Sequence, residues 1–236
     1  MGLISALANV HTTGQYGDHD DKNENKRLKI SEGKNLLIIQ IVQYKNSAFS
    51  PETIDGLKLK DQPLSVISNN DTRILWNGPK NWLLVSTKKD LILNIYQNFK
   101  ETDFAVTDLS HSKTIIQIEG KDVKEVLKKG CPFNFSKLKK NNSINSTFNG
   151  IAFTVDMLDD NPDKVRVFAL RSFGESLYHS ITDASLAFGY KSIKVSSIFS
   201  LVGLDNNVSN LFHLSNSLSK KFLRTVETFL RHLSFV

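Results

Sequence analysis

The sequence contains a single cysteine, Cys131, among its 236 residues. One thiol excludes a disulfide within the chain, and it excludes a zinc site built from several thiolates of this chain. Low cysteine content is typical of a reducing compartment, so we expect a cytoplasmic protein. The sequence also lacks any apolar run of about 20 residues and any basic stretch before its short apolar start, so it predicts neither a membrane span nor a secretory signal.

Signature motifs of nucleotide-binding proteins and of common hydrolases are absent as well. The twelve glycines form neither Gly-x-Gly-x-x-Gly nor Gly-x-x-x-x-Gly-Lys-Ser, so no dinucleotide or nucleotide phosphate site is predicted. The sequence has no Gly-x-Ser-x-Gly elbow and no His-Glu-x-x-His pair, which removes two frequent signatures of hydrolytic enzymes.

The chain is basic without carrying a concentrated basic patch. Its net charge of +6 is the difference between 30 basic and 24 acidic residues that are scattered along the sequence. Aromatic residues do not alternate with a basic run, as they do on a surface that stacks nucleic-acid bases. We therefore expect no nucleic-acid partner. The 40% apolar content is typical of a folded globular protein.

The first half of the chain alternates strand and helix patterns. Residues 12–31 are polar and dense in charge, and we interpret them as an arm or loop. Residues 34–44 carry a β-branched apolar run that predicts a buried strand. Residues 72–85 predict two strands joined at Asn-Gly-Pro-Lys, with both tryptophans in the core, and a helix capped by Thr87 is expected to follow.

The same pattern recurs further along the chain. Strands are predicted at 105–106 and 114–118, followed by a helix from Gly120 to Gly130. A strand pair is predicted within 145–157, then a strand at 165–170 and a helix at 171–188. Strand pairs that lead into helices predict an α+β fold with helices on one face of the sheet.

Three residues of a hydrolytic triad occur close together at Asp108, Ser110 and His111. Members of a triad normally come from separate segments, because the imidazole must lie between the nucleophile and the acid. We instead expect Asp108 or Ser110 to bond turn amides and His111 to fill a polar pocket.

A second candidate is Cys131, which lies between Gly130 and Pro132. The preceding Lys128 and Lys129 would lower the pKa of a nearby thiol and favour a reactive thiolate. The alternative is a buried, inert thiol at a packed helix end.

Four sequence blocks, taken in order and with their spacing, are more specific than any single motif. They are Gly-Pro-Lys-Asn-Trp-Leu-Leu-Val (78–85), Thr-Asp-Leu-Ser-His-Ser-Lys-Thr-Ile-Ile-Gln-Ile-Glu-Gly (107–120), Val-Leu-Lys-Lys-Gly-Cys-Pro-Phe-Asn-Phe (126–135) and Val-Phe-Ala-Leu-Arg-Ser-Phe-Gly-Glu-Ser-Leu-Tyr-His (167–179). This series resembles the gamma subunit of heterotetrameric sarcosine oxidase. The resemblance assigns residues 1–190 to one gamma-like domain. Residues 191–236 have no counterpart in it, and their apolar spacing predicts an amphipathic C-terminal helix.

The resemblance implies a fold with ferredoxin-like repeats, related to the folate-binding module of aminomethyltransferases. It implies a subunit of a flavin-dependent oxidoreductase that acts in sarcosine catabolism and demethylates sarcosine to glycine. The expected partners are the alpha, beta and delta subunits. FAD, FMN, NAD, tetrahydrofolate and zinc are implied on those partners, and no cofactor is expected on this chain. The alternative is a stand-alone folate-binding or aminomethyltransferase-like protein.

Because the gamma subunit carries no cofactor site in this resemblance, we expect no catalytic, cofactor-binding or metal-binding residue on this chain. The matched blocks imply family-motif or interface roles for a small set of residues, namely Asp108, Ser110, His111, Gly130, Cys131, Pro132, Arg171 and Ser172.

Overall fold

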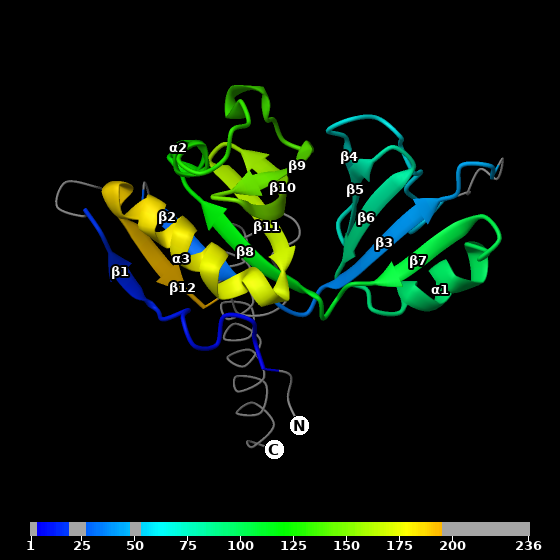
Figure 1. Ribbon diagram of the computed structural model, residues 1–236, viewed down its shortest axis with the longest axis horizontal. Coiled ribbons are helices and arrows are strands. Elements are labelled where there is room, and N and C mark those ends of the chain that lie inside the picture. The colour runs from blue at the N-terminus through cyan, green and yellow to red at the C-terminus, as the bar shows by residue number, and fades with distance from the viewer. Residues whose placement is uncertain (1–3, 19–26, 48–52, 195–236) are drawn as a thin grey trace, which may run out of the picture. The chain divides into compact units, whose positions relative to one another are not determined.

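The computed structural model describes residues 4–18, 27–47 and 53–194, which belong to one compact unit built on two β-sheets (Figure 1). The seven-stranded sheet has the order β1 (Gly14–Tyr16), β12 (Tyr190–Ile193), β2 (Leu28–Glu32), β8 (Lys113–Glu119), β11 (Asp163–Leu170), β10 (Ile151–Asp160), β9 (Ser143–Phe148). The five-stranded sheet has the order β4 (Val66–Ser68), β5 (Thr72–Gly78), β6 (Asn81–Ser86), β3 (Leu37–Gln43), β7 (Phe104–Asp108).

In the described part of the chain three α-helices accompany the strands, namely α1 (Leu91–Asn98), α2 (Val123–Lys128) and α3 (Gly174–Ser185). Short 3-10 turns occupy Phe135–Lys137, Arg171–Phe173 and Leu186–Phe188. Neighbouring strands are antiparallel, apart from the parallel pair of β2 and β12. The predicted α+β class is therefore confirmed.

The two sheets repeat the same strand arrangement. The order β4-β5-β6-β3-β7 corresponds to β9-β10-β11-β8-β12, with β2 inserted between β8 and β12. The helices follow the same rule, because α1 connects β6 to β7 and α3 connects β11 to β12. The equivalent strands β3 and β8 even share the sequence Ile-Ile-Gln-Ile, at 38–41 and 115–118. The chain therefore contains two copies of one β-rich unit.

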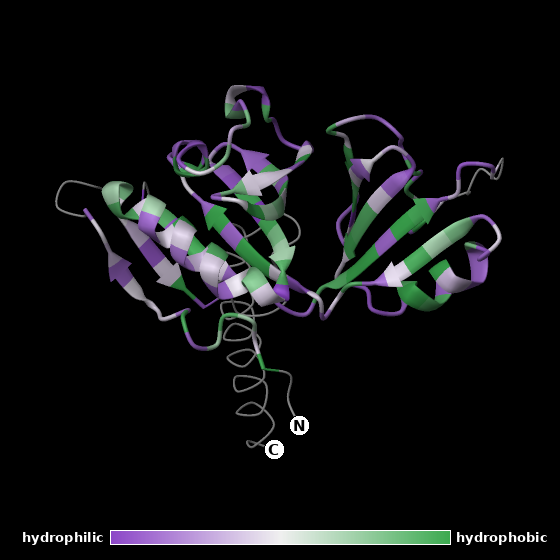
Figure 2. Ribbon diagram, viewed as in Figure 1, coloured by the Kyte–Doolittle hydropathy of each residue, from purple (hydrophilic) through white to green (hydrophobic). Residues whose placement is uncertain are grey.

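Side chains alternate between the two faces of each sheet and so build three apolar clusters. In both repeats the first isoleucine, Ile38 or Ile115, joins a cluster that contains residues of both sheets. The second and third isoleucines of each copy face the helix side, where α1 residues complete one core and α2 and α3 residues complete the other. Figure 2 shows the apolar residues running along β3 and β8, whereas α3 carries polar residues on its exposed side.

The predicted hairpin around Asn77-Gly78-Pro79 is present as β5 and β6, with Trp76 paired to Trp82. Trp82 is buried, at 3% exposure, but Trp76 is only partly buried, so the prediction of two core tryptophans is wrong for Trp76. The Trp76 indole N–H donates to Oδ1 of the exposed Asp61 at 2.8 Å, so the polar edge of the ring lies at the protein surface.

Two expectations for chain organisation need correction. Residues 12–31 do not form only an arm or loop, because β1 and all of β2 except Glu32 lie within this range. Leu28 and Ile30 of β2 are fully buried, and their short two-residue alternation was hidden among charged neighbours. The boundary at residue 190 is also displaced, since β12 begins at Tyr190 and belongs to the seven-stranded sheet.

Thr87 does not cap α1. The helix begins at Leu91, and the Thr87 hydroxyl instead donates to Asp71 Oδ1 at 3.3 Å. The predicted C-terminal amphipathic helix falls mostly in residues 195–236, outside the described part of the chain. No helix within the described ranges is long and apolar enough to cross a membrane.

Candidate functional site

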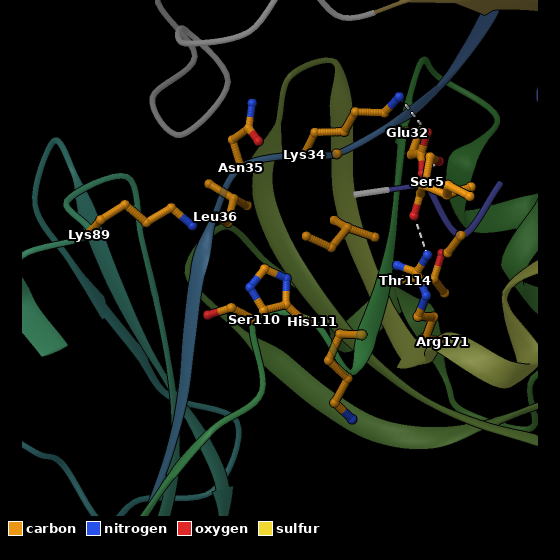
Figure 3. A pocket seen from close by; sticks show the side chains of 15 residues that line it. Ser5, Glu32, Lys34, Asn35, Leu36, Lys89, Ser110, His111, Thr114 and Arg171 are labelled. Carbon is orange, nitrogen blue, oxygen red and sulfur yellow. Dashed lines mark hydrogen bonds and ion pairs between the residues drawn. The ribbon is translucent and has the colours of Figure 1, made fainter. Parts of the chain in front are cut away.

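The candidate site lies where the chain crosses between the two sheets. Residues 33–36 lead from β2 into β3, and residues 109–112 lead back from β7 into β8. The crossings are tied to the strand ends, because Gly33 N donates to Ile115 O at 2.9 Å and Leu109 N donates to Ile38 O at 2.8 Å. A pocket of about 170 Å³ lies at these crossings and is lined by residues of both (Figure 3).

The crossing at 109–112 holds the Asp108, Ser110 and His111 motif. Asp108 Oδ1 accepts a hydrogen bond from Ser110 N at 2.8 Å, and Ser110 Oγ accepts one from Ile38 N at 3.0 Å. The expected hydrogen bond to a turn amide is therefore present at Asp108, whereas Ser110 bonds an amide of the distant strand β3. Within the described ranges no hydrogen bond joins His111 to Asp108 or Ser110, so these residues do not form a triad. Ser110 and His111 line the pocket.

Arg171 reaches the same pocket from the turn that precedes α3. Its backbone N donates to Ser112 O at 2.8 Å, and its guanidinium donates to the carbonyl of Ile4. Ser172 is exposed in the same turn and is not part of the pocket lining. The fold thus brings the Asp108–His111 and Arg171–Ser172 blocks together, although they are far apart in sequence.

The third block, Gly130–Pro132, lies elsewhere and packs against the β9–β10 hairpin. A Cβ at Gly130 would approach the Phe148 ring to 2.7 Å, so this position has no room for a side chain. Cys131 is 5% exposed and donates to Ser146 Oγ at 3.3 Å. Lys128 pairs with Glu125, and Lys129 Nζ donates to Ala184 O, so both lysines are engaged away from the thiol. This environment favours the inert, buried thiol over the reactive one.

The pocket is predominantly cationic. Lys34, Lys89, Lys113 and Arg171 line it, and the lining carboxylate is that of Glu32. Lys34 Nζ pairs with Glu32 Oε2 at 3.0 Å, and Ser5 Oγ also donates to this carboxylate. Burial lowers the pKa of Lys113, and burial also lowers the pKa of Lys89 although the negative charge of Asp108 opposes that change.

Several pocket residues were missed in the sequence analysis, namely Glu32, Lys34, Lys89, Lys113 and Thr114. Glu32, Lys113 and Thr114 lie at strand ends, whereas Lys34 and Lys89 lie in the connections from β2 to β3 and from β6 to α1. Polar residues at strand ends are the available sequence signal, but it becomes informative only once the strand order is known.

Comparisons with known proteins find a similarity in sequence and a similarity in fold. No family model matches the sequence. The chain is 28% identical over 120 residues to the sarcosine oxidase subunit gamma of Corynebacterium sp. (strain U-96), which covers 50% of this chain and 58% of that relative. No group of three or more His, Cys, Asp and Glu residues that would suit a metal ion occurs within residues 4–18, 27–47 and 53–194.

Similar solved structures include the following two. A chain of the heterotetrameric sarcosine oxidase from Corynebacterium sp. U-96, in complex with pyrrole 2-carboxylate, matches with a TM-score of 0.65 and 18% identity, covering 81% of this chain and 98% of that chain. The aminomethyltransferase T of the Bartonella henselae glycine cleavage system gives a TM-score of 0.49 and 10% identity, covering 66% of this chain and 46% of that chain. The predicted resemblance is therefore confirmed, in sequence to the sarcosine oxidase gamma subunit and in fold to a chain of the heterotetrameric enzyme.

Proposed function

We propose that this chain is a gamma-type subunit of a heterotetrameric sarcosine oxidase, supporting the oxidative demethylation of sarcosine to glycine by flavin-bearing subunits. The observation that carries the proposal is the fold match over 98% of a chain of that enzyme, combined with 28% sequence identity to a gamma subunit. The repeated strand order of the two sheets supports ferredoxin-like repeats related to the aminomethyltransferase folate-binding module.

In this proposal the partners are alpha, beta and delta subunits in the cytoplasm. FAD, FMN, NAD, tetrahydrofolate and zinc are held by those partners. This chain contributes binding surface rather than a catalytic, cofactor or metal site. Asp108, Ser110 and His111 shape the crossing that carries the surface.

One surface region has the composition of a docking site. Ile4, Leu170 and Phe173 are 72%, 48% and 49% exposed, and all three neighbour Arg171 in sequence or through its hydrogen bond to Ile4. Exposed apolar side chains next to an arginine are typical of the contact regions of protein complexes. We assign this region, together with Ser172, to the interface.

Co-expression with candidate alpha, beta and delta subunits tests the proposal. The chain should co-purify in fixed stoichiometry, and alone it should be colourless and should not consume oxygen with sarcosine. Phe173→Asp should reduce recovery of the complex, whereas Tyr96→Asp, at an aromatic residue of similar exposure on α1, should not. A yellow isolated chain that oxidises sarcosine would refute the proposal.

The stand-alone folate-binding alternative is not favoured, because the curated relative is a subunit of an oxidase. Titration of the isolated chain with tetrahydrofolate separates the two functions. Saturable binding at micromolar or lower concentration would support the alternative, and its absence is what the subunit proposal expects.

A further inference from the structure

The pocket at the two chain crossings has an excess of positive charge that the described residues do not neutralise. Glu32 is already bound by Lys34 and Ser5. Within the described part of the chain, Lys89, Lys113 and Arg171 form no ion pair with a carboxylate at 4.0 Å or less. Cations that converge without carboxylate partners create a field that attracts anions.

The repeat of the fold explains why these cations meet. Lys89 lies in the connection from β6 to α1, and Arg171 lies in the equivalent connection from β11 to α3. Lys34 precedes β3, and Lys113 begins the equivalent strand β8. Figure 3 shows Lys89 on one side of the pocket, Arg171 and Thr114 on the other, and His111 between them. Each repeat therefore supplies cationic residues to the same pocket.

Thr114 gives an independent indication of a ligand. Its side chain lines the pocket and is 2% exposed, yet its hydroxyl has no hydrogen-bond partner within the described ranges. Most buried hydroxyl groups in proteins have a hydrogen-bond partner. We therefore expect the partner of the Thr114 hydroxyl to be an atom of a ligand that this chain does not supply.

The surroundings of the Thr114 hydroxyl favour an anionic partner. It lies against Gly174, the first residue of the 12-residue helix α3, where a Cβ would approach Oγ1 to 3.1 Å. The start of a helix carries a partial positive charge, which favours a nearby anion. The lowered pKa values of Lys113 and Lys89 agree, because an anion would restore the interactions that these ammonium groups lose on burial.

We propose that this pocket binds a small anion, a carboxylate or an oxyanion such as phosphate, that accepts a hydrogen bond from Thr114 and is neutralised by Lys89, Lys113 and Arg171. The pocket of about 170 Å³ has room for a small anion. The proposal does not rest on the proposed subunit function, although Ile4 and Arg171 of the pocket also belong to the region that we assign to the interface.

The test uses the purified full chain and two probes, inorganic phosphate and acetate, titrated by calorimetry at constant ionic strength. We expect saturable binding of at least one probe to a single site, accompanied by a rise in melting temperature. The probe that binds with the higher affinity identifies the ligand class, because phosphate represents free oxyanions and acetate represents carboxylates. Absence of saturable binding for both probes would overturn the proposal.

Three variants identify the pocket as the site. Thr114→Val, which keeps the shape but removes the hydroxyl, should weaken binding about tenfold or more, while Thr114→Ser should stay within about twofold of the original affinity. Arg171→Gln should weaken binding to a similar extent. Lys139→Gln, which removes one charge from an exposed residue outside the pocket, should leave binding unchanged. Equal losses in Lys139→Gln and Arg171→Gln would overturn the proposal, because they would indicate general electrostatic attraction. Circular dichroism shows which variants are folded.

Discussion

Arg73 on β5 and Asp156 on β10 form a buried, two-point ion pair that joins the two sheets. Arg73 Nε lies 2.8 Å from Asp156 Oδ2, and Arg73 Nη2 lies 2.7 Å from Asp156 Oδ1. Asp156 is fully buried and Arg73 is 4% exposed. Burial lowers the pKa of the nearby Arg166 guanidinium to about 10. The negative charge of Asp156 opposes this shift, and the positive charge of Arg73 adds to it.

We therefore predict that Asp156→Asn destabilises the protein by about 3–5 kcal/mol, because it removes the counter-charge of the buried Arg73 guanidinium. Asp159→Asn is the matched control, since it removes the partly exposed pair with Lys140 and should cost about 1 kcal/mol or less. Urea unfolding of both variants measures the two losses. Similar small losses would show that the Arg73–Asp156 pair does not stabilise the contact between the sheets.

Trp82→Ala should cost about 3–5 kcal/mol, because the ring is buried in the helix-side core of the five-stranded sheet. Its indole N–H also donates to Lys60 O at 3.0 Å. Trp76→Ala should cost less, since Trp76 is only partly buried. Thermal and urea unfolding of both variants measure the two losses of stability. Unchanged stability of Trp82→Ala would contradict the burial of Trp82.

The acid stability of the protein should depend on Asp55. Burial would raise the pKa of this carboxyl, but hydrogen bonds from Lys88, Thr72 and Asn69 outweigh that effect and lower the pKa below 3.8. The ionised carboxylate therefore contributes stability that is fully present above the unfolded pKa and is lost as the pH falls through the lower folded pKa.

We predict that Asp55→Asn is less stable than the original protein at about pH 6 and that this difference shrinks as the pH approaches about 3. Urea unfolding across this range measures it. Asp90→Asn, at an exposed aspartate that has no side-chain cap bond, should show no such convergence. A constant difference at every pH would contradict the ionised state of Asp55 as the source of the stability.

Deleting residues 196–236 should leave the two sheets folded. Every strand and helix of the described part ends by Ile193, and the three apolar clusters are made of residues before that point. The far-ultraviolet circular dichroism spectrum and a cooperative melting transition test the truncated chain. Loss of cooperative melting would show that the deleted segment completes a core.

If the subunit proposal is correct, Asp108→Ala and His111→Ala should weaken assembly more than they change the turnover of complexes that do form. Asp108 holds the Ser110 amide, so its loss loosens the crossing that supports the proposed interface. Complex yield by size-exclusion chromatography and oxygen consumption per flavin separate the two effects. A normal yield with abolished turnover in His111→Ala would place His111 in the chemistry instead.

Local structure was predictable where the pattern was strong. The apolar run at 34–44 and the Asn-Gly-Pro-Lys turn led to β3 and to the β5–β6 hairpin, because burial periodicity and turn chemistry act between near neighbours in the chain. β1 was not predictable, since its three residues form a strand only by pairing with β12. The shared Ile-Ile-Gln-Ile of β3 and β8 was a usable signal of the repeat that the sequence analysis did not draw on.

The sequence by itself determined the α+β class, the two tryptophans flanking a turn, the exclusion of a disulfide and the hydrogen bond of Asp108 to a nearby turn amide. Only the tertiary structure decided that Arg171 meets the 109–112 crossing, that Asp156 faces Arg73, and that Thr114 has a buried hydroxyl without a partner. The reason is physical. Turns and caps depend on residues a few positions apart, whereas these contacts depend on strand order and on how the two sheets pack, which no local pattern encodes.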